Sequence, residues 1–146
     1  MIRAWKKSDN AAIFALEEKC FPDPWSEKML DDCFKANNFY GLVCEENGEI
    51  VGYCGSVFDF WEAEILLVAV DERYRRRGIA KSLLSEIIDI YDRTGKEAIY
   101  LEVRRSNISA QSLYYGLGFE KIAEREKYYQ NTEDAFVLKK SLKGEV

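Results

Sequence analysis

The feature that most constrains this chain is an apolar run followed by a basic, glycine-containing turn and an amphipathic segment. Residues 65–70 (ILLVAV) form the run, and residues 75–80 (RRRGIA) form the turn. Apolar residues then recur at positions 79, 83, 84, 87, 88 and 91, which is the spacing of one face of a helix. The order strand, turn, helix predicts an α/β protein in which this turn opens a helix.

A turn of this kind is suited to bind an anion. The first N–H groups of a helix have no partner within the helix, and the helix dipole is positive at that end. Gly78 lets a ligand approach the backbone, Ala80 adds almost no side chain, and the arginines supply donors for phosphate. We therefore expect a phosphate-bearing cofactor, with a solvated helix start and a nucleic-acid patch as alternatives. A nucleotide-hydrolase P-loop is disfavoured, because Ala80 and Arg75 stand where that motif needs glycines.

Length and composition predict one soluble globular domain over residues 1–146. The chain is 47% hydrophobic and 32% charged, and 146 residues are enough to bury a core. The net charge of -5 disfavours nucleic acid as the main partner and suits a basic peptide or amine substrate. No signal peptide is visible, and no apolar run approaches the roughly 20 residues of a membrane span. We therefore expect a cytoplasmic protein without a membrane partner.

The absence of histidine limits the chemistry. It excludes Ser–His and Cys–His nucleophile pairs and most zinc-hydrolase sites. Acid–base chemistry must then fall to Glu, Asp, Tyr, Lys or Cys. The cysteines at 20, 33, 44 and 54 lack the close spacing of a zinc or redox motif, so we expect reduced, mostly buried thiols and no metal.

The rest of the chain completes a mixed sheet with helices on both faces. Strands are expected over residues 2–5, 39–45, 50–60, 61–70, 97–103, 119–129 and 135–142. Helices are expected up to about Cys20, from Ser26 to about Phe34, from the basic turn to Gly95, and from Asn107 to Gly118. The Asn47–Gly48 pair favours the tight turn of a hairpin.

Several motifs together resemble the GCN5-related N-acetyltransferases. Residues 75–80 follow the pattern of that family's acyl-CoA pyrophosphate loop, which is Arg or Gln, two residues, Gly, one residue, then Gly or Ala. Residues 101–107 (LEVRRSN) and 112–119 (SLYYGLGF) are similar to the second half of the same fold. Residues 24–26 (PWS) and the pair Tyr128–Tyr129 are similar to the RimI-like branch, the ribosomal-protein-alanine N-acetyltransferases. The resemblance extends from about Ser8 to Leu142.

The resemblance implies that strands 61–70 and 97–103 part at their C-terminal ends and hold acetyl-CoA between them. The pantetheine arm would pair with the edge of the first strand, and the pyrophosphate would lie on the amides of the turn. The residues that the resemblance assigns to the cofactor are Val68, Ala69, Val70, Arg75, Arg76, Arg77, Gly78, Ile79, Ala80, Lys81 and Asn107. From the sequence alone, Asn107 is equally well explained as a plain helix cap.

The family's general base corresponds to Glu102 and its general acid to Tyr114. Strand alternation places Glu102 on the face opposite Leu101 and Val103, outside the apolar layer. The alternatives are a solvated or ion-paired carboxylate for Glu102 and core packing for Tyr114. No cysteine has an evident activating partner, so direct transfer in a ternary complex is expected.

The expected acceptor is a protein N-terminus, and the family's usual target is the N-terminal alanine of a small-subunit ribosomal protein. An α-amino group titrates about 2.6 units below lysine, so reaching the neutral amine requires roughly 3.5 kcal/mol less. Trp25, Tyr128 and Tyr129 are the expected walls of the peptide groove, although Trp25 also suits a core position beneath its loop. The alternatives are acetylation of lysine or a small-molecule amine, a non-catalytic acyl-CoA-binding sensor, and, third, a nucleic-acid binder. A monomer or weak homodimer is expected.

Overall fold

The computed structural model describes the backbone of residues 1–129 and 133–142 and the side chains of residues 1–126 and 133–142. The chain divides into two compact units, which are described separately. The first comprises Met1–Phe58 and Leu66–Ile87, and the second comprises Asp59–Ile65 and Ile88–Val146. One strand and one helix contribute residues to both units.

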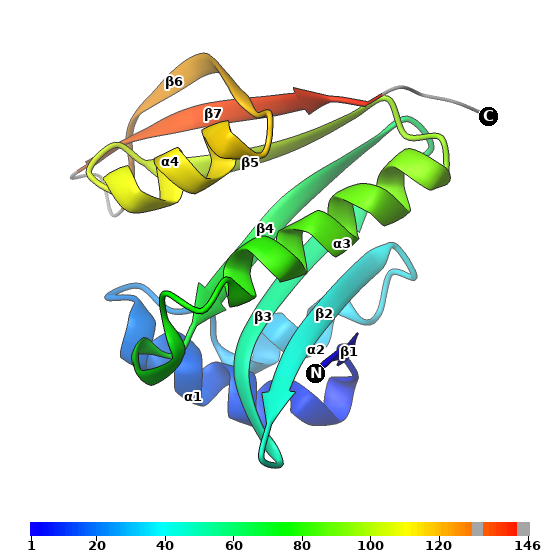
Figure 1. Cartoon of the computed structure of the whole chain (residues 1–146), viewed down its shortest axis with the longest axis vertical. Coiled ribbons are helices and arrows are strands. Elements are labelled where there is room, and N and C mark those ends of the chain that lie inside the picture. Colours follow the sequence, from blue (N-terminus) through cyan, green and yellow to red (C-terminus); the bar gives the residue numbers. More distant parts are fainter. Residues whose placement is uncertain (130–132, 143–146) are drawn as a thin grey trace. The chain divides into compact units, whose positions relative to one another are not determined.

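The elements follow the order predicted from the sequence, with two short 3-10 turns added (Figure 1). The strands are β1 (Ile2–Ala4), β2 (Phe39–Glu46), β3 (Glu49–Phe58), β4 (Glu62–Val70), β5 (Ala98–Arg104), β6 (Glu120–Tyr129) and β7 (Glu133–Ser141). The helices are α1 (Asn10–Cys20), α2 (Glu27–Cys33), α3 (Ile79–Arg93) and α4 (Ile108–Gly116), and the 3-10 turns are η1 (Lys7–Asp9) and η2 (Glu72–Tyr74). The strand order is β1-β2-β3-β4-β5-β7-β6, which confirms the predicted α/β class with a mixed sheet.

The first unit contains an antiparallel hairpin of β2 and β3, with β1 paired to β2. Asn47 and Gly48 connect the two long strands with φ values of 51° and 78°. Both values lie in the left-handed region that a primed hairpin turn requires, and Asn and Gly tolerate that region best. The sequence signal for this turn is therefore confirmed.

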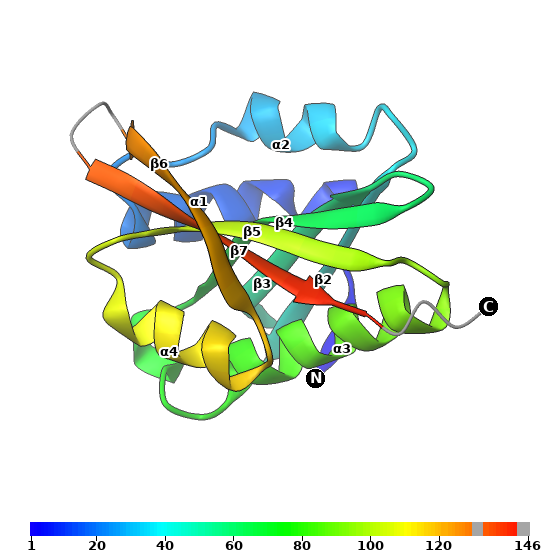
Figure 2. The same cartoon turned by 90° about the horizontal axis from the view of Figure 1, so that it is seen from above.

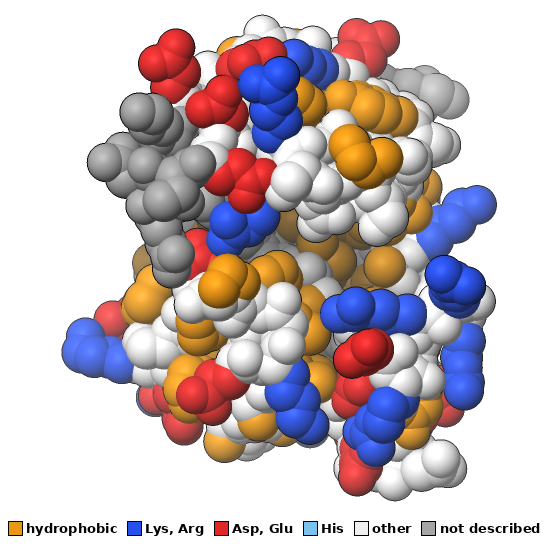
Figure 3. All heavy atoms as spheres, turned by 90° about the vertical axis from the view of Figure 1, so that its left-hand side faces the viewer, with side chains coloured by type: hydrophobic (Ala, Val, Ile, Leu, Met, Phe, Trp, Pro, Cys, Tyr) orange, Lys and Arg blue, Asp and Glu red, His pale blue; other side chains and the backbone are white. Residues whose placement is uncertain are grey.

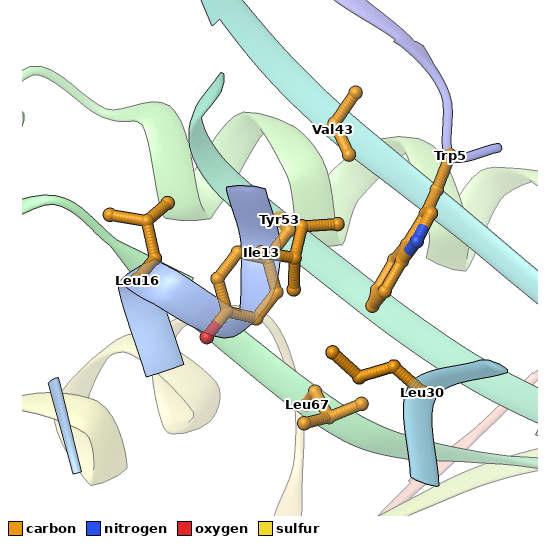
Figure 4. Packing of buried hydrophobic residues seen from close by; sticks show 7 residues of the cluster. All are labelled: Trp5, Ile13, Leu16, Leu30, Val43, Tyr53 and Leu67. Atoms are coloured by element: carbon orange, nitrogen blue, oxygen red, sulfur yellow. The ribbon is translucent and has the colours of Figure 1, made fainter. Parts of the chain in front are cut away.

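Helices α1 and α2 cover one face of this hairpin. Figure 4 shows the buried cluster between these helices and the strands, in which the Tyr53 ring of β3 lies near Ile13 and Leu16 of α1. The other members of the cluster are Trp5, Leu30, Val43 and Leu67. The opposite face contacts the start of α3, because a Cβ added at Gly52 would lie 3.1 Å from Ile79. Both faces of this part of the sheet are thus covered, as predicted.

The second unit is built on β5, which pairs in parallel with β4 and antiparallel with β7 (Figure 2). The β4 pairing is described for residues 62–65 with residues 98–101. Ile99, Leu101 and Val103 are buried, whereas Tyr100 and Glu102 on the other face are only half-buried. The predicted alternation of β5 is therefore confirmed, and the expected parting of β4 from β5 stays a prediction.

The predicted helix ends are also found. Ser26 caps α2 by accepting a hydrogen bond from the N–H of Met29 at 3.1 Å, and Gly95 follows α3 with φ 83°. All four cysteines are free; Cys44 and Cys54 are buried, whereas Cys20 and Cys33 are half-buried. Within the described residues, no helix is both long and apolar enough to cross a membrane.

Candidate active site

The basic turn in the first unit leaves its backbone open. Helix α3 begins at Ile79, and the N–H of Ser82 donates to the carbonyl of Gly78 at 2.9 Å. The N–H groups of residues 79–81 precede this first helical bond, so they are the donors that a helix start leaves for a ligand. Gly78 has φ 75°, and an added Cβ would meet nothing within 4 Å. A phosphate group therefore has access to the backbone at this point.

The arginines of the turn are held in different ways. Arg76 has φ 65°, a left-handed conformation that is uncommon for a residue with a side chain. The Arg77 guanidinium lies over the ring of Tyr74, 5.0 Å from its centroid. Arg76, Arg77 and Lys81 are exposed, so their positive charges face solvent beside the start of α3. Charge and open backbone donors coincide here, as the sequence predicts.

Arg75 contacts the end of β4 in this structure. Its Nε donates to the carbonyl of Val70 at 3.1 Å, and its Nη2 lies 3.8 Å from Sγ of Cys20. Two predicted cofactor residues, Arg75 and Val70, are therefore brought together, with Arg75 fastening the turn to the strand. Burial raises the pKa of the Cys20 thiol, with the nearby Arg75 charge acting in the opposite direction. Burial therefore favours the neutral form of the Cys20 thiol.

The segment between β4 and the turn is fixed by Asp71. Its N–H donates to the carbonyl of Val51 at 2.7 Å, and its carboxylate accepts from the N–H and the guanidinium of Arg73. These hydrogen bonds lower the pKa of Asp71 to about 2. A 3-10 turn capped by an ionised carboxylate therefore leads the chain from β4 into the basic turn. Val68 and Ala69 are half-buried just before it.

Glu102 in the second unit has one paired and one unpaired carboxylate oxygen. Its Oε1 accepts a hydrogen bond from Nη1 of Arg125 on β6 at 2.5 Å. Its Oε2 is buried and has no hydrogen-bond partner among the described residues. The Glu102 side chain is 16% exposed, so it is mostly withdrawn from water. A buried polar atom without a partner is unfavourable by about 1–3 kcal/mol, so this oxygen is available to accept a hydrogen bond from a ligand or a water molecule.

Glu64 and Arg125 are two residues near Glu102 that the sequence reasoning missed. Desolvation, followed by the charge of Glu102, raises the pKa of Glu64, whereas Arg125 acts to lower it. Strand alternation could have placed Glu64 on the same face as Glu102. Arg125 could not have been found in that way, because its position depends on the register of β6 with β7 and of β7 with β5.

Tyr114 lies on α4 and is buried, with 6% of its surface exposed. Its ring packs edge-on against Phe119 at a centroid distance of 5.9 Å. Helix α4 is attached to the end of β5 through Gln111, whose Nε2 donates to the carbonyls of Arg104 and Arg105. Asn107 caps the helix, with Oδ1 accepting from the N–H of Ala110 at 3.2 Å. The structure thus shows the packing role of Tyr114 and the capping role of Asn107, and their catalytic and cofactor roles stay predictions.

Trp25 is half-buried and packs against the core cluster of the first unit. The backbone N–H of Trp25 donates to Oε1 of Glu17 at 2.9 Å, and the Tyr53 hydroxyl donates to Oε2 of the same carboxylate at 2.5 Å. Burial raises the pKa of Glu17, although both donors act to lower it. Glu17 therefore fixes the proline-containing loop that carries Trp25, and sequence reasoning missed this residue. A glutamate in a helix gives no sign of burial until its neighbours are known.

Tyr128 and Tyr129 lie at the end of β6, and their side chains fall outside the described residues. Their expected role in the peptide groove is therefore untested. The face drawn in Figure 3 carries acidic side chains among its basic ones. Within the described residues, no group of three or more Cys, Asp or Glu side chains is arranged to hold a metal ion.

The predicted residues thus form two sets. The turn residues in the first unit offer amide donors and positive charge to a phosphate-bearing ligand, and Gly78 leaves room for it. In the second unit, Glu102 offers a proton-accepting oxygen, and Tyr114 carries a hydroxyl. The first set can bind a phosphate group, and the second set contains groups able to accept or donate a proton.

Comparison with known proteins identifies the class. Residues 10–119 match the acetyltransferase (GNAT) family. Because this match covers most of the chain, the protein belongs to the GNAT acetyltransferases and is an acetyl-CoA-dependent N-acetyltransferase.

Individual relatives cover nearly the full length. The chain is 31% identical over 140 residues to the [ribosomal protein bS18]-alanine N-acetyltransferase of Escherichia coli K12, covering 94% of each protein. It superposes on the crystal structure of the ribosomal-protein-S18-alanine N-acetyltransferase from Escherichia coli with a TM-score of 0.91 and 29% identity, covering 97% of this chain and 93% of that one. It is also similar to a chain of the NatC complex bound to Gag peptide and CoA, with a TM-score of 0.86, 26% identity, and coverage of 97% of this chain and 98% of that one. The predicted RimI-like resemblance is therefore confirmed.

Proposed function

We propose that this protein transfers the acetyl group of acetyl-CoA to the N-terminal amine of a protein, with alanine as the first residue. The acceptor class follows from relatives that span 94% of the chain and are named for acetylation of the alanine of ribosomal protein bS18. A small-subunit ribosomal protein is the proposed acceptor. The observation that carries the chemistry is the buried Oε2 of Glu102, which accepts no hydrogen bond from any described residue.

The turn residues are proposed to hold acetyl-CoA. Amides of residues 79–81 and the charges of Arg76 and Lys81 would bind its pyrophosphate, and the open backbone at Gly78 would admit it. The edge of β4 at Val68–Val70 and the side chain of Asn107 are proposed to contact the pantetheine arm. Acetyl-CoA, when bound, supplies the acetyl group as a thioester.

Glu102 is proposed to take a proton from the acceptor amine, and Tyr114 is proposed to give a proton to the departing sulfur. Oε2 of Glu102 accepts a proton from the acceptor ammonium, directly or through a water molecule, so that the amine gains the lone pair needed for attack. Attack by this nitrogen would join it to the acetyl carbon and break the bond from that carbon to sulfur, and the proton that the nitrogen sheds as it becomes an amide would pass to water. The Tyr114 hydroxyl gives its proton to the departing sulfur, which leaves as a thiol.

An N-terminal amine suits a carboxylate base better than lysine does. At neutral pH the α-amino group requires roughly 3.5 kcal/mol less to lose its proton, because its pKa is about 2.6 units lower. Trp25 is proposed to form a wall of the groove for the first acceptor residues, together with Tyr128 and Tyr129. A cytoplasmic location, a single domain, a monomer or weak homodimer, and independence from nucleic acid and membranes stay predictions.

The test uses acetyl-CoA and two peptides of equal length that carry their free amine in different places. One peptide has a free N-terminal alanine and no lysine; the other has a blocked N-terminus and one lysine. We expect thiol release and acetylation of the first peptide, located by mass spectrometry. Modification of the lysine peptide alone would contradict the proposed acceptor, and absence of thiol release with either peptide would favour an acyl-CoA-binding sensor.

Two variants test the assigned roles. Glu102→Gln and Tyr114→Phe should each lower kcat by about 10²–10⁴-fold, the usual contribution of a positioned acid or base. Their affinity for CoA, measured by calorimetry, should match that of the unmodified protein. A variant that keeps its full kcat would remove that residue from the proposed mechanism.

A further inference from the structure

We propose that Arg125 is a positioning residue for the reaction: it binds Oε1 of Glu102 and thereby presents Oε2 to the acceptor amine. This inference rests on the proposed function, because it assumes that Glu102 is the base. It adds an arginine on β6 to the proton-transfer residues proposed on β5 and α4. The observation behind it is that Oε1 of Glu102 accepts a hydrogen bond from Arg125, whereas Oε2 accepts none from a described residue.

The contact geometry is specific. Nη1 of Arg125 lies 2.5 Å from Oε1 of Glu102, whereas Oε2 is buried and accepts no hydrogen bond from any described residue. An arginine that only neutralised the carboxylate would be free to bind both oxygens through its planar fork. Engagement of a single oxygen restricts rotation of the carboxylate and leaves the second oxygen available to a donor.

The surroundings of Glu102 explain why it needs such a partner. Glu64 is paired in register with Tyr100, two residues before Glu102, so all three side chains lie on the same face of the sheet. Desolvation and then the nearby charge of Glu102 raise the pKa of Glu64, as expected for two carboxylates that repel each other. The positive charge of Arg125, hydrogen-bonded to Glu102, offsets this repulsion. Arg125, on the β6 side, supplies the opposing attraction.

The exposure of the pair distinguishes it from ordinary surface ion pairs. Arg125 is 51% exposed, but Glu102 is only 16% exposed, so the carboxylate end of the interaction is shielded from water. Arg93 and Asp89 on α3 form a contrasting pair with an Nε–Oδ2 distance of 2.9 Å, in which the side chains are 68% and 64% exposed. An exposed pair of that kind contributes little to geometry. Arg93 therefore serves as the matched control.

The first measurement is the steady-state kinetics of Arg125→Ala with the alanine peptide. We expect kcat to fall by about 10²-fold, the effect of misplacing a catalytic group by about 1 Å, with little change in KM for either substrate. Arg125→Lys, which retains the charge, should recover part of kcat, and added guanidinium ion at millimolar concentration should partly restore Arg125→Ala. Arg93→Ala should retain full kcat. An unchanged kcat in Arg125→Ala, or a loss confined to KM, would overturn the proposal.

The second measurement is a double-mutant cycle with Glu102→Gln. If Arg125 acts through Glu102, then Arg125→Ala should cause no further loss of kcat in the Glu102→Gln background. An equal loss in both backgrounds would show that Arg125 acts independently and would overturn the inference. The cycle also separates this inference from the proposed function: full activity of Glu102→Gln itself would refute the assigned base, whatever Arg125 does.

Discussion

Gly78 combines two properties that the basic turn needs. Its φ of 75° is a conformation that glycine adopts without strain, and the space above its Cα is empty. The first property shapes the turn, and the second leaves the amides of the helix start open to a ligand. A side chain at this position would affect both, so the two effects must be separated by a control. Gly48, in the hairpin turn, has φ 78° and is equally open, but it belongs to no proposed site.

Gly78→Ala and Gly48→Ala should therefore differ only in ligand binding. Each should lower the free energy of unfolding by about 1–2 kcal/mol, because an alanine in the left-handed region is strained. Saturating CoA should raise the melting temperature of Gly48→Ala as much as that of the unmodified protein, and should raise that of Gly78→Ala much less. Thermal denaturation with and without CoA checks this. Equal shifts in both variants would show that the pyrophosphate does not lie against Gly78.

Helix α1, strand β3 and the loop before α2 are joined by one buried carboxylate. Glu17 of α1 is 2% exposed and accepts from the Tyr53 hydroxyl of β3 and from the N–H of Trp25 in the loop. Such a network is stable only when each acceptor is satisfied, because an unpaired buried charge is strongly unfavourable. The position of the Trp25 loop, and with it the proposed peptide groove, therefore depends on this carboxylate.

Tyr53→Phe removes one of these donors without changing the ring. We expect a loss of about 1–3 kcal/mol in the free energy of unfolding, because a buried acceptor is left partly unpaired. KM for the alanine peptide should rise, while affinity for CoA stays unchanged. Tyr100→Phe is the control, since the Tyr100 hydroxyl donates to Glu62 at 2.9 Å in a half-buried position, and its loss should change stability much less. Urea denaturation and steady-state kinetics provide the measurements; equal destabilisation by both variants would contradict the role given to Glu17.

For the whole molecule, stability at acid pH depends on carboxylates whose pKa values are changed by folding. Asp71 is ionised and hydrogen-bonded to Arg73, and its pKa is lowered from 3.8 to about 2. A group with a lowered pKa stabilises the folded state above its unfolded value, and that contribution is lost as the pH falls through the folded value. Glu17 has the opposite effect on stability, because folding raises its pKa. The folded state therefore loses stability as the pH rises above 4.5, the ordinary pKa of a glutamate.

Asp71→Asn should consequently be less stable than the unmodified protein at neutral pH but not at very low pH. The difference in unfolding free energy should diminish between about pH 4 and pH 2, as Asp71 becomes protonated in the unmodified protein. Urea denaturation at a series of pH values measures it. A difference that persisted unchanged to pH 2 would show that the Asp71 charge does not stabilise the fold.

The order of helices and strands, the hairpin turn at Asn47–Gly48 and the opening of α3 by the basic turn followed from the sequence alone. These features are local, because periodicity, glycine and helix caps act within a few residues of one another. The same holds for the direction of Glu102 out of the apolar layer, which strand alternation determines. The catalytic and cofactor assignments came from resemblance to a family, and they stay proposals for this chain.

The partners of buried charged groups were decided only by tertiary structure. Arg125 is 23 residues from Glu102 in the chain, and they meet because strand order and register bring β5 and β6 together. Tyr53 is 36 residues from Glu17, and they meet because α1 packs on β3. The resemblance assigned Arg75 to the cofactor, which stays a prediction, and its hydrogen bond to the carbonyl of Val70 became visible only in the tertiary structure. Side-chain pairing across strands depends on register, and a shift of one residue reverses every side chain. For this reason the chain's elements could be predicted from local pattern, whereas the contacts that orient Glu102 and Trp25 could not.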